Sequence, residues 1–160
     1  MPDMLANLLH LPPAEPSVAA LAAEGIQIRR ALAPDKRLVL DWVERHAGTP
    51  AVGECDVAFS RIPVSCFIAT RGRDILGFAC YEATARNFFG PTEVLETERG
   101  KGIGKILLIR SLLAMRDEGY AYAIIGGVGP AEFYAKSVGA VLIGNSTPGI
   151  YRDFLGGKDD

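Results

Sequence analysis

Residues 98–104, Glu-Arg-Gly-Lys-Gly-Ile-Gly, have the composition and spacing of a loop that binds phosphate. They follow a segment, 91–97, that is predicted to be extended, and they precede a long apolar segment that is predicted to be helical. The first N–H groups of a helix lack intrahelical partners, and the helix dipole places partial positive charge there. Glycine lets an anion approach the backbone closely, and Arg99 and Lys101 add positive charge. The loop is therefore predicted to bind a diphosphate.

Three types of phosphate loop can be compared with this spacing. A P-loop requires Gly-x4-Gly-Lys followed by Ser or Thr, but Gly104-Lys105 is followed by Ile106, and Arg99 stands at the first glycine position. A dinucleotide-binding fold requires Gly-x-Gly-x-x-Gly near the start of a βαβ unit, whereas this Gly-x-Gly-x-Gly lies about two-thirds of the way along the chain. The third type, Arg-x-x-Gly-x-Gly, fits without adjustment. A glycine-rich connector that binds no ligand is the remaining alternative.

Length and composition are those of one globular domain. The chain has 160 residues, 49% of them hydrophobic, and a formal net charge of −2 from 17 basic and 19 acidic residues. This balance argues against a nucleic-acid partner and gives no reason to expect a cationic substrate. No segment approaches the roughly 18 apolar residues of a membrane span, and residues 5–11 lack the basic start of a secretory signal. We therefore expect a cytoplasmic protein with no membrane partner.

The cysteines and histidines do not predict a metal site. Cys55, Cys66 and Cys80 contain no Cys-x-x-Cys pair, and the two histidines, His10 and His46, lie far apart in the sequence. The cysteines are interpreted as buried, reduced thiols rather than as disulfides or metal ligands.

The apolar pattern predicts a mixed α/β domain over residues 24–155, preceded by a loosely tied arm at 1–23 and followed by a short tail at 156–160. Strands are expected at 25–32, 64–71, 74–83, 91–97, 120–126, 140–143 and 149–154, and helices at 34–45, 54–61, 102–118 and 130–139. The short break between the second and third strands favours a hairpin, and hence a partly antiparallel sheet. The helix at 102–118 is apolar on more than one face, so a second layer of the chain or a second subunit should cover it, and a homodimer is left open.

Residues 88–154 resemble the cofactor-binding half of a GCN5-related N-acetyltransferase. Two motifs carry the resemblance: Val-Leu-Glu-Thr-Glu-Arg-Gly-Lys-Gly-Ile-Gly-Lys-Ile-Leu-Leu at 94–108, and Ala-Glu-Phe-Tyr-Ala-Lys-Ser-Val-Gly-Ala at 131–140, which is similar to the family's Phe-Tyr-x-Lys-x-Gly helix. The first half of the chain matches in element order only. Glu96 stands where the family often has proline, and Glu93 where relatives often have a small residue. The resemblance implies a single α/β domain with a twisted, mostly antiparallel sheet, a splayed strand pair and flanking helices.

The same resemblance implies that acetyl-CoA is the acyl donor and that no metal is needed. The pantetheine arm would lie in the gap of the splayed strands, where backbone groups of Val94 would bind it and polarise the thioester carbonyl. The implied cofactor-binding residues are Val94, Leu95, Arg99, Gly100, Lys101, Gly102, Ile103, Gly104 and Lys105. The implied reaction is acetyl transfer to a primary amine by direct attack in a ternary complex. An acyl-CoA-binding sensor without catalysis and a nucleotide-phosphate binder are the alternatives.

Tyr134 is the residue predicted to handle the leaving group. A coenzyme A thiolate should have a pKa near that of cysteine, about 8.5, and a tyrosine hydroxyl in reach can protonate it as it leaves. The alternative is a buried tyrosine whose hydroxyl only binds a backbone carbonyl.

Candidates for the general base are Glu93 and Glu82, with Glu96 as a further possibility, all on the two strands expected before the loop. Cys80 is a weaker candidate for a nucleophile, because no histidine lies near it in the sequence. The acceptor pocket is expected between residues 42–61, the loop at 86–90 and the C-terminal strands. The sequence does not identify the acceptor beyond a small-molecule or peptide amine.

Overall fold

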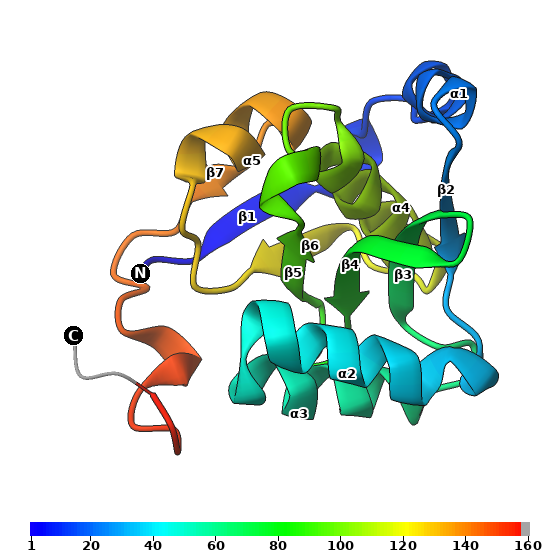
Figure 1. The fold of residues 1–160 in the computed structure, drawn as a ribbon. Helices are drawn as coiled ribbons and strands as arrows, with labels where there is room; N and C mark the ends of the chain where they lie inside the picture. Colours follow the sequence, from blue (N-terminus) through cyan, green and yellow to red (C-terminus); the bar gives the residue numbers. More distant parts are fainter. Residues whose placement is uncertain (158–160) are drawn as a thin grey trace.

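The computed structural model describes residues 1–157, so most of the expected tail at 156–160 lies outside the described residues. In this part of the chain, seven strands form one sheet in the order β2-β3-β4-β5-β6-β1-β7 (Figure 1). The strands are β1 (Met4–Asn7), β2 (Ile26–Arg30), β3 (Cys66–Arg71), β4 (Asp74–Tyr81), β5 (Phe88–Val94), β6 (Tyr122–Ile125) and β7 (Val141–Leu142). All neighbouring pairs are antiparallel except β5 and β6, which are parallel. The mixed α/β fold with a mostly antiparallel sheet is thus confirmed.

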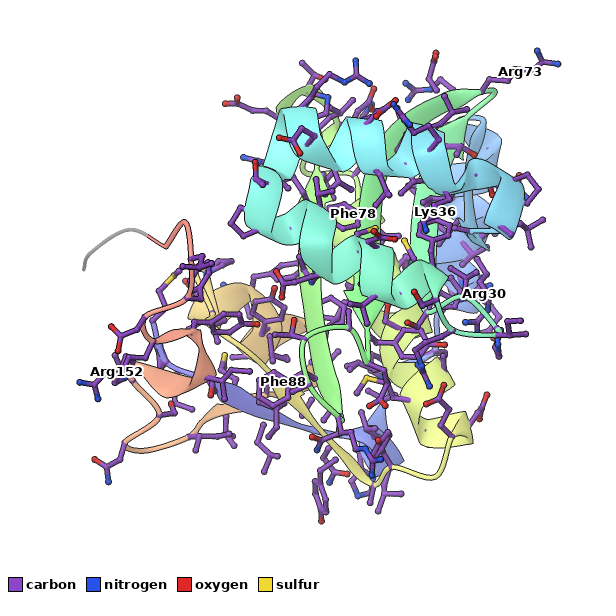
Figure 2. All side chains as sticks on the ribbon, turned by 90° about the horizontal axis from the view of Figure 1, so that it is seen from below. Arg30, Lys36, Arg73, Phe78, Phe88 and Arg152 are labelled. Atoms are coloured by element: carbon purple, nitrogen blue, oxygen red, sulfur yellow. The ribbon has the colours of Figure 1, made fainter. Side chains whose placement is uncertain are left out.

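Helices cover both faces of the sheet. The α-helices are α1 (Glu15–Ala23), α2 (Lys36–Ala47), α3 (Thr49–Phe59), α4 (Ile103–Asp117) and α5 (Ala131–Val138). Helices α2 and α3 lie on one face, and α1, α4 and α5 on the other (Figure 1). Each face has its own apolar core. Trp42 of α2 packs edge-on against Phe78 of β4 at 5.9 Å, and Phe78 is visible beside these helices in Figure 2.

Helix α4 is buried on more than one face, as its sequence predicts, and the chain itself supplies the cover. Ile103, Ile106, Leu107, Leu108 and Ile109 are all 1% exposed or less. Besides the sheet, helix α1 and the 3₁₀ turn η1 (Leu8–His10) lie against α4. The apolar surface of α4 therefore gives no reason to require a second subunit.

The N-terminal segment differs from the expected loose arm. Strand β1 lies inside the sheet, paired with β6 on one side and with β7 on the other. Met4 and Ala6 point into the core and are 2% and 0% exposed. The strand has only four residues, and its partners are at least 115 residues away, so its local pattern could not reveal the pairing.

Other boundaries differ for local reasons. Helix α3 begins at Thr49 rather than at residue 54, because Pro50 lies in its first turn, where proline is favoured. Strand β5 covers Phe88–Val94 rather than 91–97, and Glu96–Glu98 form the 3₁₀ turn η3. The expected strand at 149–154 is wrong. Gly149–Tyr151 form the 3₁₀ turn η4 instead, and Gly149 and Asp153 have positive φ, which interrupts an extended chain.

Strands β5 and β6 separate after a short contact. Their pairing is confined to Phe88 with Ile124 and Phe89 with Ile125, after which β5 continues to Val94 alone on that side. This is the splayed strand pair that the family resemblance implies. Among residues 1–157, none of the helices has both the length and the apolar character needed to cross a bilayer.

Candidate functional site

The free edge of β5 presents backbone groups to the gap. The Leu95 N–H donates to the Leu76 carbonyl across the β4 side, at 2.9 Å. In an antiparallel pair, every second residue of a strand points both its N–H and its C=O toward the partner strand, and the residues between point both groups away from it. Residues 93 and 95 therefore face β4, while Thr92 and Val94 turn their N–H and C=O groups toward the gap. Such an edge can accept an extended ligand as an added strand.

Two charged side chains hold the backbone groups of Val94. The Val94 N–H donates to Glu93 Oε1 at 3.2 Å, and Arg99 Nε donates to the Val94 carbonyl at 3.3 Å. Arg99 Nη2 also donates to Glu93 Oε1 at 2.9 Å. The Glu93–Arg99 ion pair thus occupies the groups that the sequence assigns to the pantetheine arm. A ligand that binds Val94 as a strand must replace both side chains.

The glycine-rich loop has the conformation that its glycines allow. Arg99 is extended, whereas Gly100 and Gly102 have φ of +84° and +89°, and Gly102 is the residue just before α4. These φ values strain any residue with a Cβ. Gly104 differs, because a Cβ there would make ordinary contacts of 3.6 Å to Val94 and 3.7 Å to Phe133. The loop therefore connects the free end of β5 directly to the start of α4.

Helix α4 begins without a side-chain cap. No side chain bonds to its first backbone groups among the described residues, and Ile103, Gly104 and Lys105 open its first turn. The N–H groups of a first turn have no intrahelical acceptors and lie at the positive end of the helix dipole. The buried Ile103 side chain and the half-buried Leu95 side chain fix this turn against the core. The geometry suits an anion such as a phosphate.

The positive side chains of the loop are already in ion pairs. Glu98 accepts two hydrogen bonds from Arg71, at 2.7 and 3.2 Å, and one from Lys101 at 2.5 Å. The bond from Arg71 and then that from Lys101 lower the pKa of Glu98 to about 2. Arg99 pairs with Glu93, as described above. The loop thus combines cations with carboxylates, whereas the sequence suggested free counter-charge for a phosphate.

Tyr134 lies beside the gap with its ring packed and its hydroxyl available. The ring contacts Phe89 of β5 and Phe133 of α5 edge-on, at 6.3 and 5.0 Å. Burial, and secondarily the negative charge of Glu93, raise the pKa of Tyr134 to about 12. The hydroxyl therefore keeps its proton at neutral pH. It makes no hydrogen bond to another side chain or to the backbone within residues 1–157.

Glu82, the other candidate base, is separated from this site. It lies five residues beyond Gly77, which pairs with Val94, and this is roughly 16 Å along a strand. Its carboxylate accepts a hydrogen bond from the backbone N–H of Asn87 and another from the Tyr120 hydroxyl, at 3.1 Å. Glu82 also has a positive φ of 55°. These contacts hold the turn between β4 and β5, so the structure brings together Glu93, Val94 and Tyr134 without Glu82.

Two groups of polar residues near the gap come from segments in which the acceptor pocket was expected, although no catalytic role was predicted for them. His46, at the end of α2, lines a pocket of about 180 Å³ together with Glu93, Val94, Leu95, Glu96 and Arg99. Sequence reasoning considered His46 only as a metal ligand. No local pattern places the C-terminal end of α2 beside the free end of β5.

The second group lies near the end of β6. Glu54 of α3 accepts a hydrogen bond from Thr84, and burial raises the pKa of its carboxyl group although that bond opposes the shift. Burial also raises the pKa of Tyr151, and the Glu54 charge acts in the same direction. Gly126, just after β6, leaves room for the side chains of Phe88 and Tyr151. A Cβ at this position would lie 2.9 Å from the Phe88 ring and 3.0 Å from the Tyr151 hydroxyl. The gap is therefore bordered by protein side chains at both ends.

Comparison with known proteins supports the fold at the level of structure. No protein-family model matches the sequence, and the comparison with curated proteins gives no match. Among solved structures, the GCN5-related glucosamine N-acetyltransferase region of a fungal multi-domain GH3 β-N-acetylglucosaminidase has a TM-score of 0.71 at 13% identity, over 89% of this chain and 19% of that one. A GCN5-related N-acetyltransferase from Sphaerobacter thermophilus has a TM-score of 0.63 at 21% identity, over 89% of this chain.

The chain therefore has the fold of the GCN5-related N-acetyltransferases, as its two motifs implied. A further neighbour from Kribbella flavida, also described as a GCN5-related N-acetyltransferase, has a TM-score of 0.54 at 12% identity over 88% of this chain. The chain spans 19%, 48% and 53% of these three proteins, which are all longer. Identities this low establish a common fold, while activity has to be argued from the site.

Proposed function

We propose that the protein is an N-acetyltransferase that transfers an acetyl group from acetyl-CoA to a primary amine by direct attack in a ternary complex. One observation carries the proposal: the unpaired edge of β5 runs without interruption into a glycine loop and the uncapped start of α4. An acyl-CoA is an extended pantetheine arm that ends in a pyrophosphate. A strand edge followed by an anion-binding helix terminus matches that order of groups.

Cofactor binding in this proposal exchanges internal contacts for ligand contacts. The pantetheine amides would replace Glu93 and Arg99 on the backbone of Val94. The N–H groups at 100–105 would bind the pyrophosphate, and Arg99, released from Val94, would be free to bind phosphate as well. Charge-assisted hydrogen bonds to phosphate are stronger than neutral ones, which favours the exchange.

The chemical steps are assigned to two residues beside the gap. Tyr134 donates a hydrogen bond to the departing thiolate and passes its proton to the sulfur as the carbon–sulfur bond breaks, since its pKa of about 12 keeps the hydroxyl protonated beforehand. The tyrosinate is a stronger base than the thiolate and regains its proton from solvent water. Glu93 removes a proton from the attacking ammonium through a water molecule. Glu93 pairs across the strands with Phe78, whose ring faces α2 and α3, so the amine would approach from that face. His46 and the pocket at the end of β5 are on the same route.

The nature of the acceptor stays a prediction, as do the absence of a nucleic-acid partner and the homodimer. One structural neighbour is described as a glucosamine N-acetyltransferase region, and glucosamine is a small primary amine. Small-molecule amines are therefore the first class to test, followed by peptide N-termini.

Two measurements test the function in order. Acetyl-CoA at 100 times its dissociation constant should stabilise the protein by about 2.7 kcal/mol, whereas ATP and NAD should not. Release of free thiol should then be measured over a panel of primary amines, with acetyl-CoA alone as the background. Stabilisation without turnover on any amine would favour the non-catalytic acyl-CoA sensor. Stabilisation by ATP instead of acetyl-CoA would overturn the proposal.

A further inference from the structure

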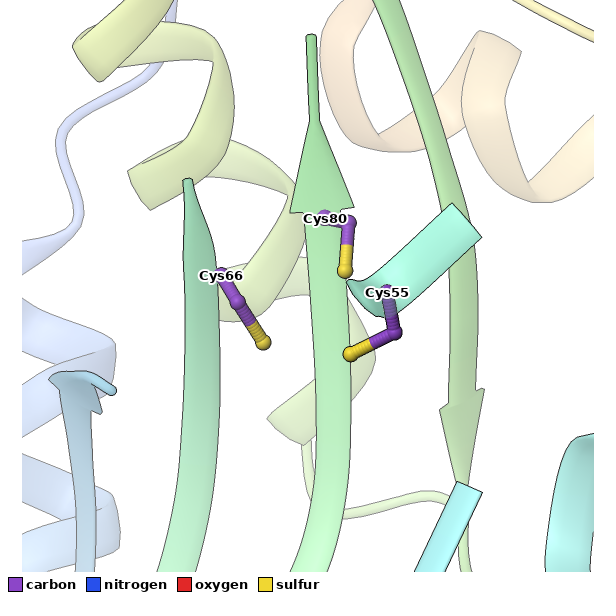
Figure 3. Close-up of side chains that lie close together, drawn as sticks. All are labelled: Cys55, Cys66 and Cys80. Atoms are coloured by element: carbon purple, nitrogen blue, oxygen red, sulfur yellow. The ribbon is translucent and has the colours of Figure 1, made fainter. Parts of the chain in front are cut away.

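The three cysteines of the chain meet in the core between the sheet and helix α3. Cys55 comes from α3, Cys66 from the first position of β3 and Cys80 from β4, and all three are fully buried and unbridged (Figure 3). Their sulfur atoms lie within 4.8 Å of one another. They are separated by 11 and 14 residues in the sequence, so no local motif could have shown that they converge.

Strand register brings two of the sulfurs together. Cys66 and Cys80 are direct cross-strand partners. Tyr81 N–H donates to the Ser65 carbonyl at 3.0 Å, and the Cys66 carbonyl accepts from Ala31 on the other side, so the Cys66–Cys80 pair is a non-hydrogen-bonded one. Side chains are closest in such pairs. Helix α3 then places Cys55 over both.

The surroundings of the three thiols are apolar. The cluster contains Trp42, Phe78 and aliphatic side chains from α2, α3 and the sheet. All three cysteines are 0% exposed. Any ligand that the three sulfur atoms bind is therefore enclosed by apolar side chains.

The apolar surroundings select the ion by its charge. A buried net charge without a partner is costly. Three thiolates around Cu(I) would carry a net charge of −2, and around Zn(II) a net charge of −1. Zinc would also lack the fourth ligand that structural zinc sites require, because only the three cysteines group together within residues 1–157. A trivalent ion bound by three thiolates is neutral.

We propose that Cys55, Cys66 and Cys80 form a three-thiolate site for trivalent arsenic. Arsenous acid exchanges its three hydroxyl groups for the three sulfur atoms. Three S–H and three As–O bonds break, three As–S and three O–H bonds form, and three water molecules leave. No oxidant or reductant takes part, because arsenic stays trivalent and each sulfur stays at the thiol level. The product is neutral and is enclosed by apolar side chains.

The size of the site is compatible with this bonding. Sulfurs at the corners of a triangle with sides of 4.8 Å would each lie about 2.8 Å from its centre, compared with roughly 2.3 Å for a zinc–sulfur bond. A small inward rotation of each side chain closes this difference.

Helix α3 provides the route of entry. Its start has no side-chain cap, it follows Gly48 at a φ of +92°, and Gly53 lies in its interior. An internal glycine destabilises a helix relative to alanine, so local opening of α3 is expected to be easier than opening of the sheet. Bound arsenic would fasten α3 to β3 and β4. This inference does not depend on the acetyltransferase proposal.

The test uses the reduced full-length protein and sodium arsenite as the probe. We expect a 1:1 complex by native mass spectrometry, lighter than the sum of its parts by three waters. X-ray absorption at the arsenic edge should show three sulfur neighbours and no oxygen. The Tm should rise, because a site assembled by the fold binds the native state and not the unfolded chain.

Single substitutions test whether the three cysteines bind arsenite together as one site or separately as unrelated thiols. Cys55→Ser, Cys66→Ser and Cys80→Ser should each weaken arsenite binding by about 100-fold or more, since one of three linked contacts is lost. Ile68→Val, which alters the same apolar cluster without touching a thiol, should bind arsenite like the parent. Each serine variant is checked for a cooperative melt without arsenite, and an alanine replacement is used where serine prevents folding.

Several results would overturn the proposal. They are a lowered Tm with arsenite, an oxygen atom in the arsenic shell of the parent protein, and unchanged affinity in any one cysteine variant. Displacement of arsenic by equimolar Zn(II) or Cu(I) would overturn the charge argument and, with it, the assignment of the ion.

Discussion

The two ends of strand β5 differ in how their backbone is satisfied. At one end, where Phe88 is labelled in Figure 2, residues 88 and 89 lie between β4 and β6, and Phe89 is 2% exposed. At the other end, Glu93 and Val94 have a strand on one side only, and the charged side chains of Glu93 and Arg99 take the place of the missing strand.

This difference separates a permanent contact from a replaceable one. Ladder bonds between buried strands open only when the sheet opens. An ion pair such as Glu93–Arg99, in which the arginine side chain is 58% exposed, stabilises the protein by about 1 kcal/mol or less. A ligand can therefore displace it at little cost. The N–H and C=O groups of Val94 at the free end thus stay hydrogen-bonded to Glu93 and Arg99 until an extended ligand replaces them.

The largest effect is expected at Tyr134, which packs against the paired end of the strand and is influenced by the charge at its free end. Its ring packs on Phe89 at the paired end, while its hydroxyl is influenced by Glu93 at the free end. Tyr134→Phe keeps the packing and removes only the hydroxyl. Turnover should fall by about 100-fold or more, the scale of general-acid removal, with a much smaller change in acetyl-CoA affinity. Single-turnover kinetics, which isolate acyl transfer from product release, make the measurement.

Tyr122→Phe is the matched control, because Tyr122 is 49% exposed and precedes the residues of β6 that pair with β5. It should retain parental turnover. A Tyr134→Phe protein with the parental rate of acyl transfer would remove this hydroxyl from the mechanism. The thiolate would then take its proton from water or from the amine.

The next effect is expected in the loop that follows the free end. Gly102→Val forces a β-branched residue into φ of +89°, at a cost of about 1–2 kcal/mol, and brings bulk to the proposed pyrophosphate site. Acetyl-CoA affinity should fall by about tenfold or more, as measured by isothermal titration calorimetry. Gly104→Ala is the control, since the added Cβ makes ordinary contacts and the position is helical. Equal affinity of both variants for acetyl-CoA would place the pyrophosphate elsewhere.

Two smaller effects of opposite sign are expected at Glu93, one on acetyl-CoA affinity and one on kcat. Glu93→Gln weakens the Glu93–Arg99 ion pair, so acetyl-CoA should bind up to about fivefold more tightly, in proportion to the modest strength of exposed pairs. If Glu93 is the base, kcat should fall in the same variant. Glu132→Gln, which removes a carboxylate from an exposed ion pair on α5, should change neither quantity. Weaker acetyl-CoA binding in Glu93→Gln would contradict the idea that this side chain stands in for the ligand.

How far the sequence could predict the site depends on the range of the interactions. The glycine loop, the helix after it and Tyr134 lie in two short motifs, and their conformations are set by neighbouring residues such as Gly102 and Pro130. Their roles as binding and catalytic residues stay predictions. The sequence did not predict the pairing of Arg99 with Glu93, because an ion pair depends on side-chain geometry that spacing does not encode.

Contacts between distant segments were predicted least well. Strand β1 was taken for a loose arm because its partners, β6 and β7, lie at the other end of the chain. The same holds for His46 beside β5, and for Cys55, Cys66 and Cys80, which are brought together by strand register and helix packing. Glu82 shows the converse. It is close to Glu93 in chain order and on the adjacent strand, yet antiparallel pairing carries it to the other end.

The smallest effect is expected at Glu98, which fixes the loop beyond the free end of β5. Its pKa is lowered from 4.5 to about 2 by Arg71 and Lys101, so the folded protein binds fewer protons than the unfolded chain between these values. The stabilisation is fully present above pH 4.5 and is lost as the pH falls toward 2. Glu98→Gln should therefore lower the urea midpoint slightly at neutral pH and make it less dependent on pH in the acidic window. Glu96→Gln, an exposed neighbour on the same turn, is the control and should follow the parent curve. If Glu98→Gln and the parent lose stability in parallel between pH 4.5 and 2, then the ion pairs do not hold the loop, and its conformation is set by Gly100 and Gly102 alone.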